Sequence, residues 1–255
     1  MIELRDVTKA FGAKKAVDHL DFRVRAGELF AFLGPNGAGK TTTIKMVCGL
    51  LAPTSGTVRV GGHLAGTAQA RQLLAYVPDQ PYLYEKLTGR EFLKFVVEMY
   101  GLESRYATRK IHELIDIFEM NDYIDELCET YSHGMKQRVV FASALVHEPK
   151  VLIVDEPLVG LDPRSARIVK DLFLAQARSG VAVLMSTHLL SIAEELADTI
   201  GIVDHGRMLA HGTLGELRTK LQRDDSLEDL FLALTGGDRP NLVGRPTPIS
   251  TGGLV

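Results

Sequence analysis

A glycine-rich loop at residues 34–42 constrains the fold of this chain more than any other stretch. Its sequence is Gly-Pro-Asn-Gly-Ala-Gly-Lys-Thr-Thr, which has the form G-x-x-x-x-G-K-[ST]. Glycines let the backbone curl tightly, so that successive N–H groups converge on one anion. Lys40 supplies a mobile ammonium for the outer phosphates of a nucleotide, and the hydroxyl of Thr41 can ligate Mg²⁺. The loop therefore predicts a nucleotide phosphate site.

The segments on either side of the loop fit this role. Residues 30–33 form a short apolar run typical of a buried strand, and residues 42–50 have the character of a helix. A helix that begins near Gly39 would add its free N–H groups and its positive dipole end to the anion site. The alternative is a glycine-rich turn that happens to precede a lysine. The order strand, loop and helix favours the nucleotide site, because the motif requires that order.

Composition bounds the class of protein. The 255 residues are 45% hydrophobic and 24% charged, as in an ordinary soluble globular protein with an ample core. The net charge of −3 gives no reason to expect nucleic acid as a partner. No apolar run approaches the roughly 18 residues of a membrane-spanning helix, and the first residues lack the apolar core of a signal peptide. We therefore expect a cytosolic chain that reaches any membrane through a partner.

The order of the expected elements indicates an α/β fold. Short strands are expected at residues 2–7, 17–24 and 57–60. After residue 150, apolar runs alternate with helices, as expected of parallel strands covered on both faces. These runs occupy residues 151–154, 181–185 and 200–203. One domain over residues 1–235 fits this pattern, and the Gly-, Pro-, Thr- and Ser-rich residues 236–255 are expected to be a disordered tail.

Residues of about 86–148 carry helical patterns without strand signals, which predicts a helical subdomain inserted into the α/β chain. A capping-box sequence at residues 88–91 opens its first helix. The apolar residues that follow have helical spacing, and we expect them to form a packed face. They are Phe92, Phe95, Val96 and Met99, and the next helix has Ile111, Leu114, Ile115 and Phe118.

Two acidic residues end the apolar run at residues 151–154. Asp155 and Glu156 would emerge from the carboxyl end of a parallel strand, in the crevice where open α/β sheets bind ligands. Asp155 is expected to hold Mg²⁺, and Glu156 to orient and deprotonate the attacking water. His188 ends a neighbouring apolar strand, where its imidazole could bind the γ-phosphate or the water. The alternatives are a solvated pair of acids and a structural histidine.

These residues complete a resemblance over about residues 2–235 to the nucleotide-binding subunit of an ATP-binding-cassette (ABC) transporter. Six motifs stand in the family's order: Phe11 as the adenine-stacking aromatic, 34–41 as Walker A, 131–135 as the signature, 151–156 as Walker B, 159–162 as the D-loop and His188 as the switch histidine. The resemblance implies a P-loop NTPase with a mostly parallel central sheet, an N-terminal antiparallel β region and an inserted helical subdomain. The residues expected to bind ATP are Gly34, Pro35, Asn36, Gly37, Ala38, Gly39, Lys40, Thr41, Thr42, Phe11, Ser132 and Gly134.

The resemblance also implies a mechanism and partners. Two such domains, as a homodimer or as a heterodimer with a second ABC subunit, sandwich ATP head to tail. Ser132 and Gly134 of one then contact the γ-phosphate held by the other. ATP binding closes the dimer and hydrolysis opens it, which drives a transmembrane permease from the cytoplasmic side of the membrane. The stretch at residues 84–93 and the short C-terminal extension resemble exporters whose permease is a separate chain.

The sequence departs from the family pattern at two motifs. In the signature, His133 stands in place of the first glycine and Met135 in place of glutamine. In the Q-loop, the register of the family's glutamine, which helps to bind Mg²⁺, falls on Asp79, and Gln80 comes one place later. Either Asp79 takes the metal role or Gln80 reaches in after a local shift.

Two other functions share parts of this pattern. A soluble single-cassette ABC ATPase, for example one of iron–sulfur assembly, has the same architecture and would bind a soluble scaffold. A small-molecule kinase uses the same phosphate loop and would transfer phosphate to an acceptor, whereas a transporter subunit releases ADP and free phosphate.

Overall fold

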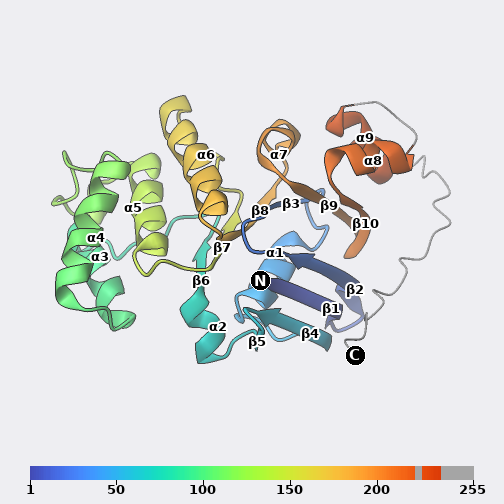
Figure 1. The fold of residues 1–255 in the computed structure, drawn as a ribbon, viewed down its shortest axis with the longest axis horizontal. Coiled ribbons are helices and arrows are strands. Elements are labelled where there is room, and N and C mark those ends of the chain that lie inside the picture. Colours follow the sequence, from blue (N-terminus) through green and yellow to red (C-terminus); the bar gives the residue numbers. More distant parts are fainter. Residues whose placement is uncertain (222–225, 237–255) are drawn as a thin grey trace, which may run out of the picture.

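The chain folds around two β-sheets that share a core (Figure 1). The computed structural model describes residues 1–221 and 226–236. Apart from Gly236, the tail expected at residues 236–255 lies outside the described residues. The described strands are β1 Ile2–Phe11, β2 Lys14–Val24, β3 Leu29–Leu33, β4 Ser55–Val60, β5 His63–Leu64, β6 Leu74–Val77, β7 Val151–Asp155, β8 Ala182–Thr187, β9 Thr199–Asp204 and β10 Arg207–Gly212.

The larger sheet has six strands in the order β10-β9-β3-β8-β7-β6. Its pairs are parallel except for the edge pair of β10 with β9. The smaller sheet is antiparallel along β1 with β2 and β4, in the order β2-β1-β4-β5. The parallel strands place their carboxyl ends at one edge of the sheet, where the glycine-rich loop follows β3. This is the α/β architecture that the motifs predicted.

Helices cover the larger sheet and extend beyond one end of it (Figure 1). Helix α1 packs against β2, β4 and β7, between the two sheets. Helices α3, α4 and α5 follow β6 and precede β7, and they form a lobe at one end of the molecule. The described helices are α1 Lys40–Val47, α2 Ala68–Leu73, α3 Gly89–Met99, α4 Ser104–Ile117, α5 His133–Leu145, α6 Pro163–Arg178, α7 Leu190–Leu196, α8 Leu214–Leu221 and α9 Leu227–Thr235. The limits of about 86–148 for a subdomain stay a prediction.

Strand β3 has buried side chains on both of its faces, as a central parallel strand must. Phe30 and Phe32 lie in the core between the sheets, where both rings stack on Phe22 with centroids 5.1 and 5.4 Å away. Leu29, Ala31 and Leu33 point to the other face and join the core under the helices. This alternation of side chains between the two faces fixes the register of β3, because a shift by one residue would turn the two phenylalanines toward the helices.

The packed face expected on the first helix of the lobe is partly wrong. In α3 the buried residues are Gly89, Leu93 and Val97, whereas Phe95 is 38% exposed and Met99 is 72% exposed. Leu93 and Val97, each one position after a residue of the expected stripe, form the centre of the buried face. Phe92 and Val96 lie at its margin and are only partly buried. The stripe expected on α4 is confirmed, since its four apolar residues are all buried. Helix α3 therefore leaves an aromatic and a methionine on the surface.

His147 makes the stability of the lobe depend on pH. Its ring stacks on Tyr100 at a centroid distance of 3.8 Å, and its Nε2 lies 3.3 Å from the carbonyl oxygen of Leu74. Burial lowers the pKa of His147 from 6.5 to about 4. Between these two values the unfolded chain binds more protons than the folded one, so stability is full above pH 6.5 and falls as the pH falls.

We expect the free energy of unfolding to drop by about 2 kcal/mol between pH 7.5 and pH 5 because of this histidine. Urea denaturation across this range measures the drop. The His147→Phe variant keeps an aromatic ring against Tyr100 and cannot titrate, so it should show a flatter profile. An equal slope in wild type and variant would contradict the assignment.

Candidate functional site

The glycine-rich loop runs from the end of β3 to the start of α1, and its backbone packs closely against neighbouring strands. Gly39, which precedes the first helical residue, has φ +105°, a value that favours glycine. A Cβ at Gly39 would lie 2.4 Å from the carbonyl oxygen of Ala16, and a Cβ at Gly34 would lie 2.4 Å from that of Val203. Both glycines are therefore required by close contacts with neighbouring strands. The loop presents the N-terminus of α1, where an anion is stabilised.

Lys40 folds back over this loop. Its Nζ donates to the carbonyl oxygens of Gly34 at 2.6 Å and Pro35 at 3.3 Å, and the residue is buried. Burial lowers the pKa of Lys40, while Glu156 and Asp155 act in the opposite direction. The ammonium therefore lies at the loop with acidic residues nearby, in position for a phosphate.

The loop forms one wall of a hollow of about 450 Å³. The residues that line it come from the β1–β2 hairpin, the loop, the start of α1, the end of β7 and the segment after β6. They are Phe11, Lys14, Ala16, Pro35, Asn36, Gly37, Gly39, Lys40, Thr41, Thr42, Asp79, Asp155 and Glu156. Lys14 and Ala16 were not predicted from the sequence, because no motif marks strand residues that reach the loop through the fold. Phe11 is half exposed at this hollow, open for stacking on a base.

Asp155 is the buried carboxylate of the hollow. Ser186 of β8 donates its hydroxyl to Oδ1, and Thr41 also forms a hydrogen bond with this carboxylate. Oδ2 is buried without a partner among the described residues. Burial raises the pKa of Asp155, and the two hydroxyls act against this rise. Ser186 lies in the run before His188, yet nothing in the sequence alone gave it a role.

This donor set fits Mg²⁺. The hydroxyl of Thr41 and the free oxygen of Asp155 are hard ligands, and such an ion takes only one or two carboxylates from the protein, with phosphates and water as the rest. In the described residues no group of three or more His, Cys, Asp and Glu side chains is placed to hold a metal. The ion would therefore depend on the nucleotide as well as on the chain.

Glu156 follows β7 in a conformation rare for a non-glycine residue, with φ +49°. Its backbone N–H donates to the carbonyl oxygen of Ser186 at 3.1 Å, which holds the turn. One carboxylate oxygen lies 2.9 Å from Nδ1 of His188 and 3.3 Å from the backbone nitrogen of the same residue. Backbone strain of this kind occurs at functional sites, where surrounding contacts hold it. The carboxylate and the imidazole thus form one unit, of which Glu156 lines the hollow and His188 does not.

The structure separates the two Q-loop candidates. Asp79 lines the hollow, and Gln80 is not among the residues that line it. The carboxylate of Asp79 accepts a hydrogen bond of 2.9 Å from the backbone N–H of Gln80. Asp79 is therefore better placed than Gln80 for the metal role.

We expect Asp79→Ala to raise the Mg²⁺ concentration needed for half-maximal turnover about tenfold, because a charge-assisted contact to the ion is lost. Gln80→Ala should leave this concentration within about twofold of wild type, and it is the matched control. A magnesium titration of ATP turnover measures both. Equal and negligible effects would mean that neither residue binds the ion.

Ser132 and Gly134 are not part of this hollow. Ser132 caps α5, and its hydroxyl accepts from the backbone N–H of Met135 at 3.3 Å. Beside them lies the segment before α6: the imidazole of His133 lies 3.5 Å from where a Cβ on Gly160 would stand. Ser132 is exposed. Within one chain, the α5 terminus therefore contributes nothing to the hollow at the phosphate loop.

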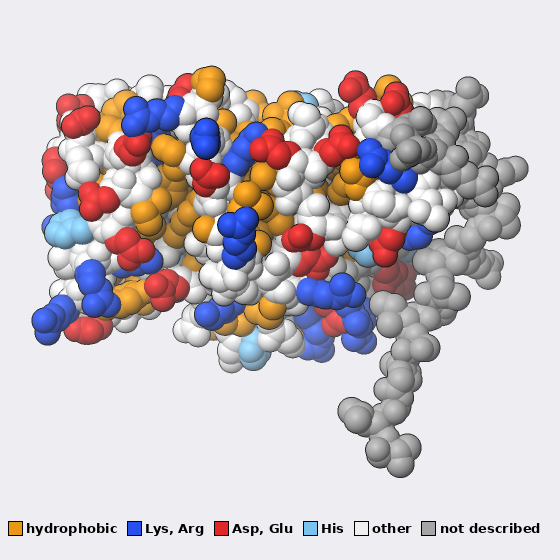
Figure 2. Space-filling model, turned by 45° about the horizontal axis from the view of Figure 1, so that its top comes forward, with side chains coloured by type: hydrophobic (Ala, Val, Ile, Leu, Met, Phe, Trp, Pro, Cys, Tyr) orange, Lys and Arg blue, Asp and Glu red, His pale blue; other side chains and the backbone are white. Residues whose placement is uncertain are grey.

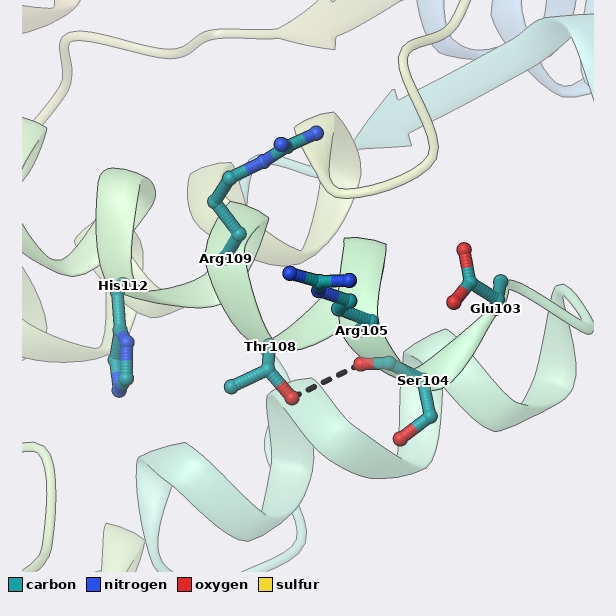
Figure 3. Close-up of a pocket in the computed structure, with 6 residues that line it drawn as sticks. All are labelled: Glu103, Ser104, Arg105, Thr108, Arg109 and His112. Atoms are coloured by element: carbon teal, nitrogen blue, oxygen red, sulfur yellow. Dashed lines mark hydrogen bonds between the residues drawn. The ribbon is translucent and has the colours of Figure 1, made fainter.

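A second hollow lies on the lobe, along the first turns of α4 (Figure 3). Its six lining residues come from α4 and the residue before it, and they are Glu103, Ser104, Arg105, Thr108, Arg109 and His112. Thr108 donates its hydroxyl to the carbonyl oxygen of Ser104 at 2.9 Å, a contact within the helix. No residue of the phosphate loop lines this hollow, so it is separate from the nucleotide site.

The fold and the hollow define the class of this chain as a P-loop NTPase. The family model described as "ABC transporter" matches residues 17–159. The linearmycin resistance ATP-binding protein LnrL of Bacillus subtilis is 38% identical over 230 residues, covering 89% of this chain and 74% of the relative. The daunorubicin/doxorubicin resistance ATP-binding protein DrrA of Streptomyces peucetius is 41% identical over 222 residues, covering 86% and 67%.

A solved structure titled "Structure of ATP binding subunit of ABC transporter" superposes with a TM-score of 0.88 at 34% identity, covering 92% of this chain and 99% of the other. The chain therefore belongs to the ABC transporter family and has its ATP-binding domain. Among the described helices, none is long and apolar enough to cross a membrane.

Proposed function

We propose that this chain hydrolyses ATP to ADP and phosphate and powers export through a separate transmembrane permease. The observation that carries the proposal is the shared hollow: the phosphate loop, the buried Asp155 and Glu156 all line it, and His188 contacts Glu156 at 2.9 Å. A phosphate-binding loop alone serves kinases as well. A carboxylate beside the loop, held by an imidazole, supports water activation and hence hydrolysis.

Each residue of the hollow has one task in this proposal. Phe11 stacks on the base, and the loop N–H groups with Lys40 bind the outer phosphates. Thr41, Asp155 and Asp79 would hold Mg²⁺, which would supply positive charge to the outer phosphates. Glu156 accepts the proton of the attacking water, and His188 holds the carboxylate in position through the 2.9 Å contact. Ser186 keeps Asp155 oriented from β8.

Members of this family typically dimerise and pair with transmembrane subunits. We propose a head-to-tail dimer of two copies, because one chain supplies both halves of the composite site. The hollow carries the loop and the acids, while Ser132 and Gly134 stand at a capped helix start outside it. The N–H groups and positive end of α5 are then available to the γ-phosphate bound by the partner. The hollow and the N-terminus of α5 are two different surfaces. In a dimer with a two-fold axis, the hollow of each copy faces the α5 N-terminus of the other, which gives two ATP sites.

An exposed aromatic edge on the lobe supports a permease partner. It consists of Tyr82, which is 75% exposed, Tyr84 and Phe95, and the exposed Met99 follows Phe95 by one turn of α3. Tyr84 contacts Phe95 edge to face at 5.5 Å and Tyr82 at 6.0 Å, so the rings form one cluster. Clustered exposed aromatics mark protein interfaces. Tyr82 and Tyr84 follow Asp79 by three and five residues, and Asp79 lines the hollow. A permease docked on these rings would therefore contact the segment that leads to the nucleotide site. The drug-resistance names of the two relatives support export as the direction.

Acidic and basic side chains are interspersed on the face drawn in Figure 2. The net charge of −3 and this mixture of charges give no basic surface for nucleic acid on this face, so the proposal includes no nucleic-acid partner.

Isolation of the chain from gently solubilised membranes tests the transport role. We expect the wild-type chain to co-purify with a multi-span membrane protein, and a Tyr82→Ala/Met99→Ala variant to lose that partner while its ATP turnover is retained. Recovery in a soluble scaffold complex would favour the iron–sulfur assembly alternative. Transfer of phosphate from ATP to an acceptor, without free phosphate, would favour a kinase.

A further inference from the structure

The turn between β9 and β10 connects the phosphate loop to β2 through the backbone of one residue. The N–H of Gly206 donates to the carbonyl oxygen of Ala38 in the loop at 2.9 Å. The carbonyl oxygen of Gly206 accepts from the N–H of Asp18 in β2, also at 2.9 Å. Gly206 is therefore a single backbone link between two segments that lie 20 residues apart in sequence.

The contacts around this link leave little freedom. A Cβ at Gly206 would lie 2.8 Å from the carbonyl oxygen of Ala16, and one at Gly39 would lie 2.4 Å from the same oxygen. Both distances are shorter than real Cβ contacts allow, so backbone packs directly on backbone here. A displacement of β2 or of the turn is therefore transmitted to the loop. Ala16 and Lys14, on the same strand, also line the hollow.

An ion pair between Asp18 of β2 and Arg207 of β10 joins the same two segments, and it lies outside the hollow. The guanidinium of Arg207 binds one carboxylate oxygen of Asp18, with Nε at 2.7 Å and Nη2 at 2.5 Å, and Nζ of Lys15 binds the other oxygen at 2.8 Å. The side chain of Asp18 is only 7% exposed, whereas that of Arg207 is 68% exposed. Hydrogen bonds from Lys15 and Arg207 lower the pKa of Asp18 to about 2. The carboxylate therefore stays ionised in any ordinary assay buffer.

We propose that Asp18 and Arg207 are positioning residues for nucleotide binding. Through the turn at Gly206, their ion pair holds the phosphate loop at the distance from β2 that a triphosphate requires. Neither residue lines the hollow, so their effect on the nucleotide is indirect. Small displacements of binding groups weaken their contacts strongly, so this distance sets the affinity. The inference rests on the proposed ATP binding at the loop.

The test compares Asp18→Asn and Arg207→Gln with wild type by calorimetric titration of ATP, and by kcat and KM for turnover. We expect each variant to bind ATP about tenfold more weakly and to have a KM raised by a similar factor, with kcat at saturation within about twofold. The double variant should bind no more weakly than the weaker single variant, because the two residues act as one pair. Arg207→Lys, which keeps a cation, should recover most of the affinity.

The matched control is Asp125→Asn, which removes another charged pair, with Arg90, at 2.7 and 3.0 Å on the lobe. It should change the thermal midpoint but leave ATP affinity within about twofold. If Asp18→Asn fails to fold, Arg207→Gln decides, since Lys15 still pairs with Asp18 in that variant. ATP affinity equal to wild type in a folded variant would overturn the inference. A wild-type chain that binds no ATP would instead refute the proposed function.

Discussion

Replacing Lys40 with alanine is expected to weaken ATP binding about a hundredfold, or about 3 kcal/mol, since a charged contact to the outer phosphates disappears from a partly buried site. Turnover should fall below detection at ordinary ATP concentrations. The physical reason is the location of the ammonium, whose Nζ lies against the loop carbonyl of Gly34 at 2.6 Å. Lys14 of β2 also lines the hollow, but the loop carbonyls of Gly34 and Pro35 accept from Lys40. Fluorescence titration with a labelled ATP analogue measures the loss.

Lys45→Ala is the matched control, because Lys45 lies in the same helix and is exposed. It should bind ATP with wild-type affinity. A thermal melt without nucleotide separates binding from folding, since Lys40→Ala also removes two hydrogen bonds to the loop. Turnover that survives in Lys40→Ala would show that the loop is not the ATP site.

The second large effect is expected for Glu156→Gln. Hydrolysis should fall about a thousandfold, because the amide cannot accept the proton of the attacking water. ATP affinity should stay within about threefold of wild type, since the change keeps the shape of the side chain and Lys40 still binds the phosphates. The variant should therefore accumulate with ATP bound. Phosphate release measures the rate, and light scattering at saturating ATP should give the mass of a dimer.

Glu98→Gln is the control for the loss of a carboxylate, because Glu98 is an exposed residue of α3 that does not line the hollow. It should hydrolyse ATP at the wild-type rate. A Glu156→Gln protein that stays monomeric at saturating ATP would contradict the dimer, and one that keeps its turnover would contradict the role of the base. The two outcomes separate the chemistry from the assembly.

The sequence predicted the strand, loop and helix around residues 34–42 because this motif is read from local spacing. It also predicted the capping box at the start of α3, where the hydroxyl of Thr88 accepts from the N–H of Glu91 and the carboxylate of Glu91 accepts from the N–H of Thr88. It gave no indication of β6, a four-residue strand whose place between β7 and the lobe depends on tertiary pairing. Apolar spacing on α3 predicted a buried Met99 that is exposed, because helical periodicity marks an apolar face but not what covers it.

In the site, too, residues that belong to local motifs were predicted and contacts between distant segments were not. Asp155, Glu156 and Lys40 were predicted because each belongs to a motif at a strand end or helix start. Ser186 was missed as a partner of Asp155, since the parallel pairing of β7 with β8 brings them together from 31 residues apart. The left-handed backbone of Glu156 and the contact of Gly39 with Ala16 were also beyond local patterns. Such contacts depend on the packing of distant strands.

The central claim is that two copies of this chain complete one ATP site. Gly134→Asp and Lys40→Ala disrupt opposite halves of that site, and each protein alone should be inactive. A Cβ at position 134 has space within its own chain, because the nearest neighbouring atom, Oδ2 of Asp162, lies 4.0 Å away.

Mixing the two inactive variants tests the claim most directly. A head-to-tail dimer of one copy of each has one intact composite site, so the mixture should regain up to about a quarter of the wild-type phosphate release. A mixture that stays as inactive as its components, although both variants are folded and the Gly134→Asp protein binds ATP, would contradict the account.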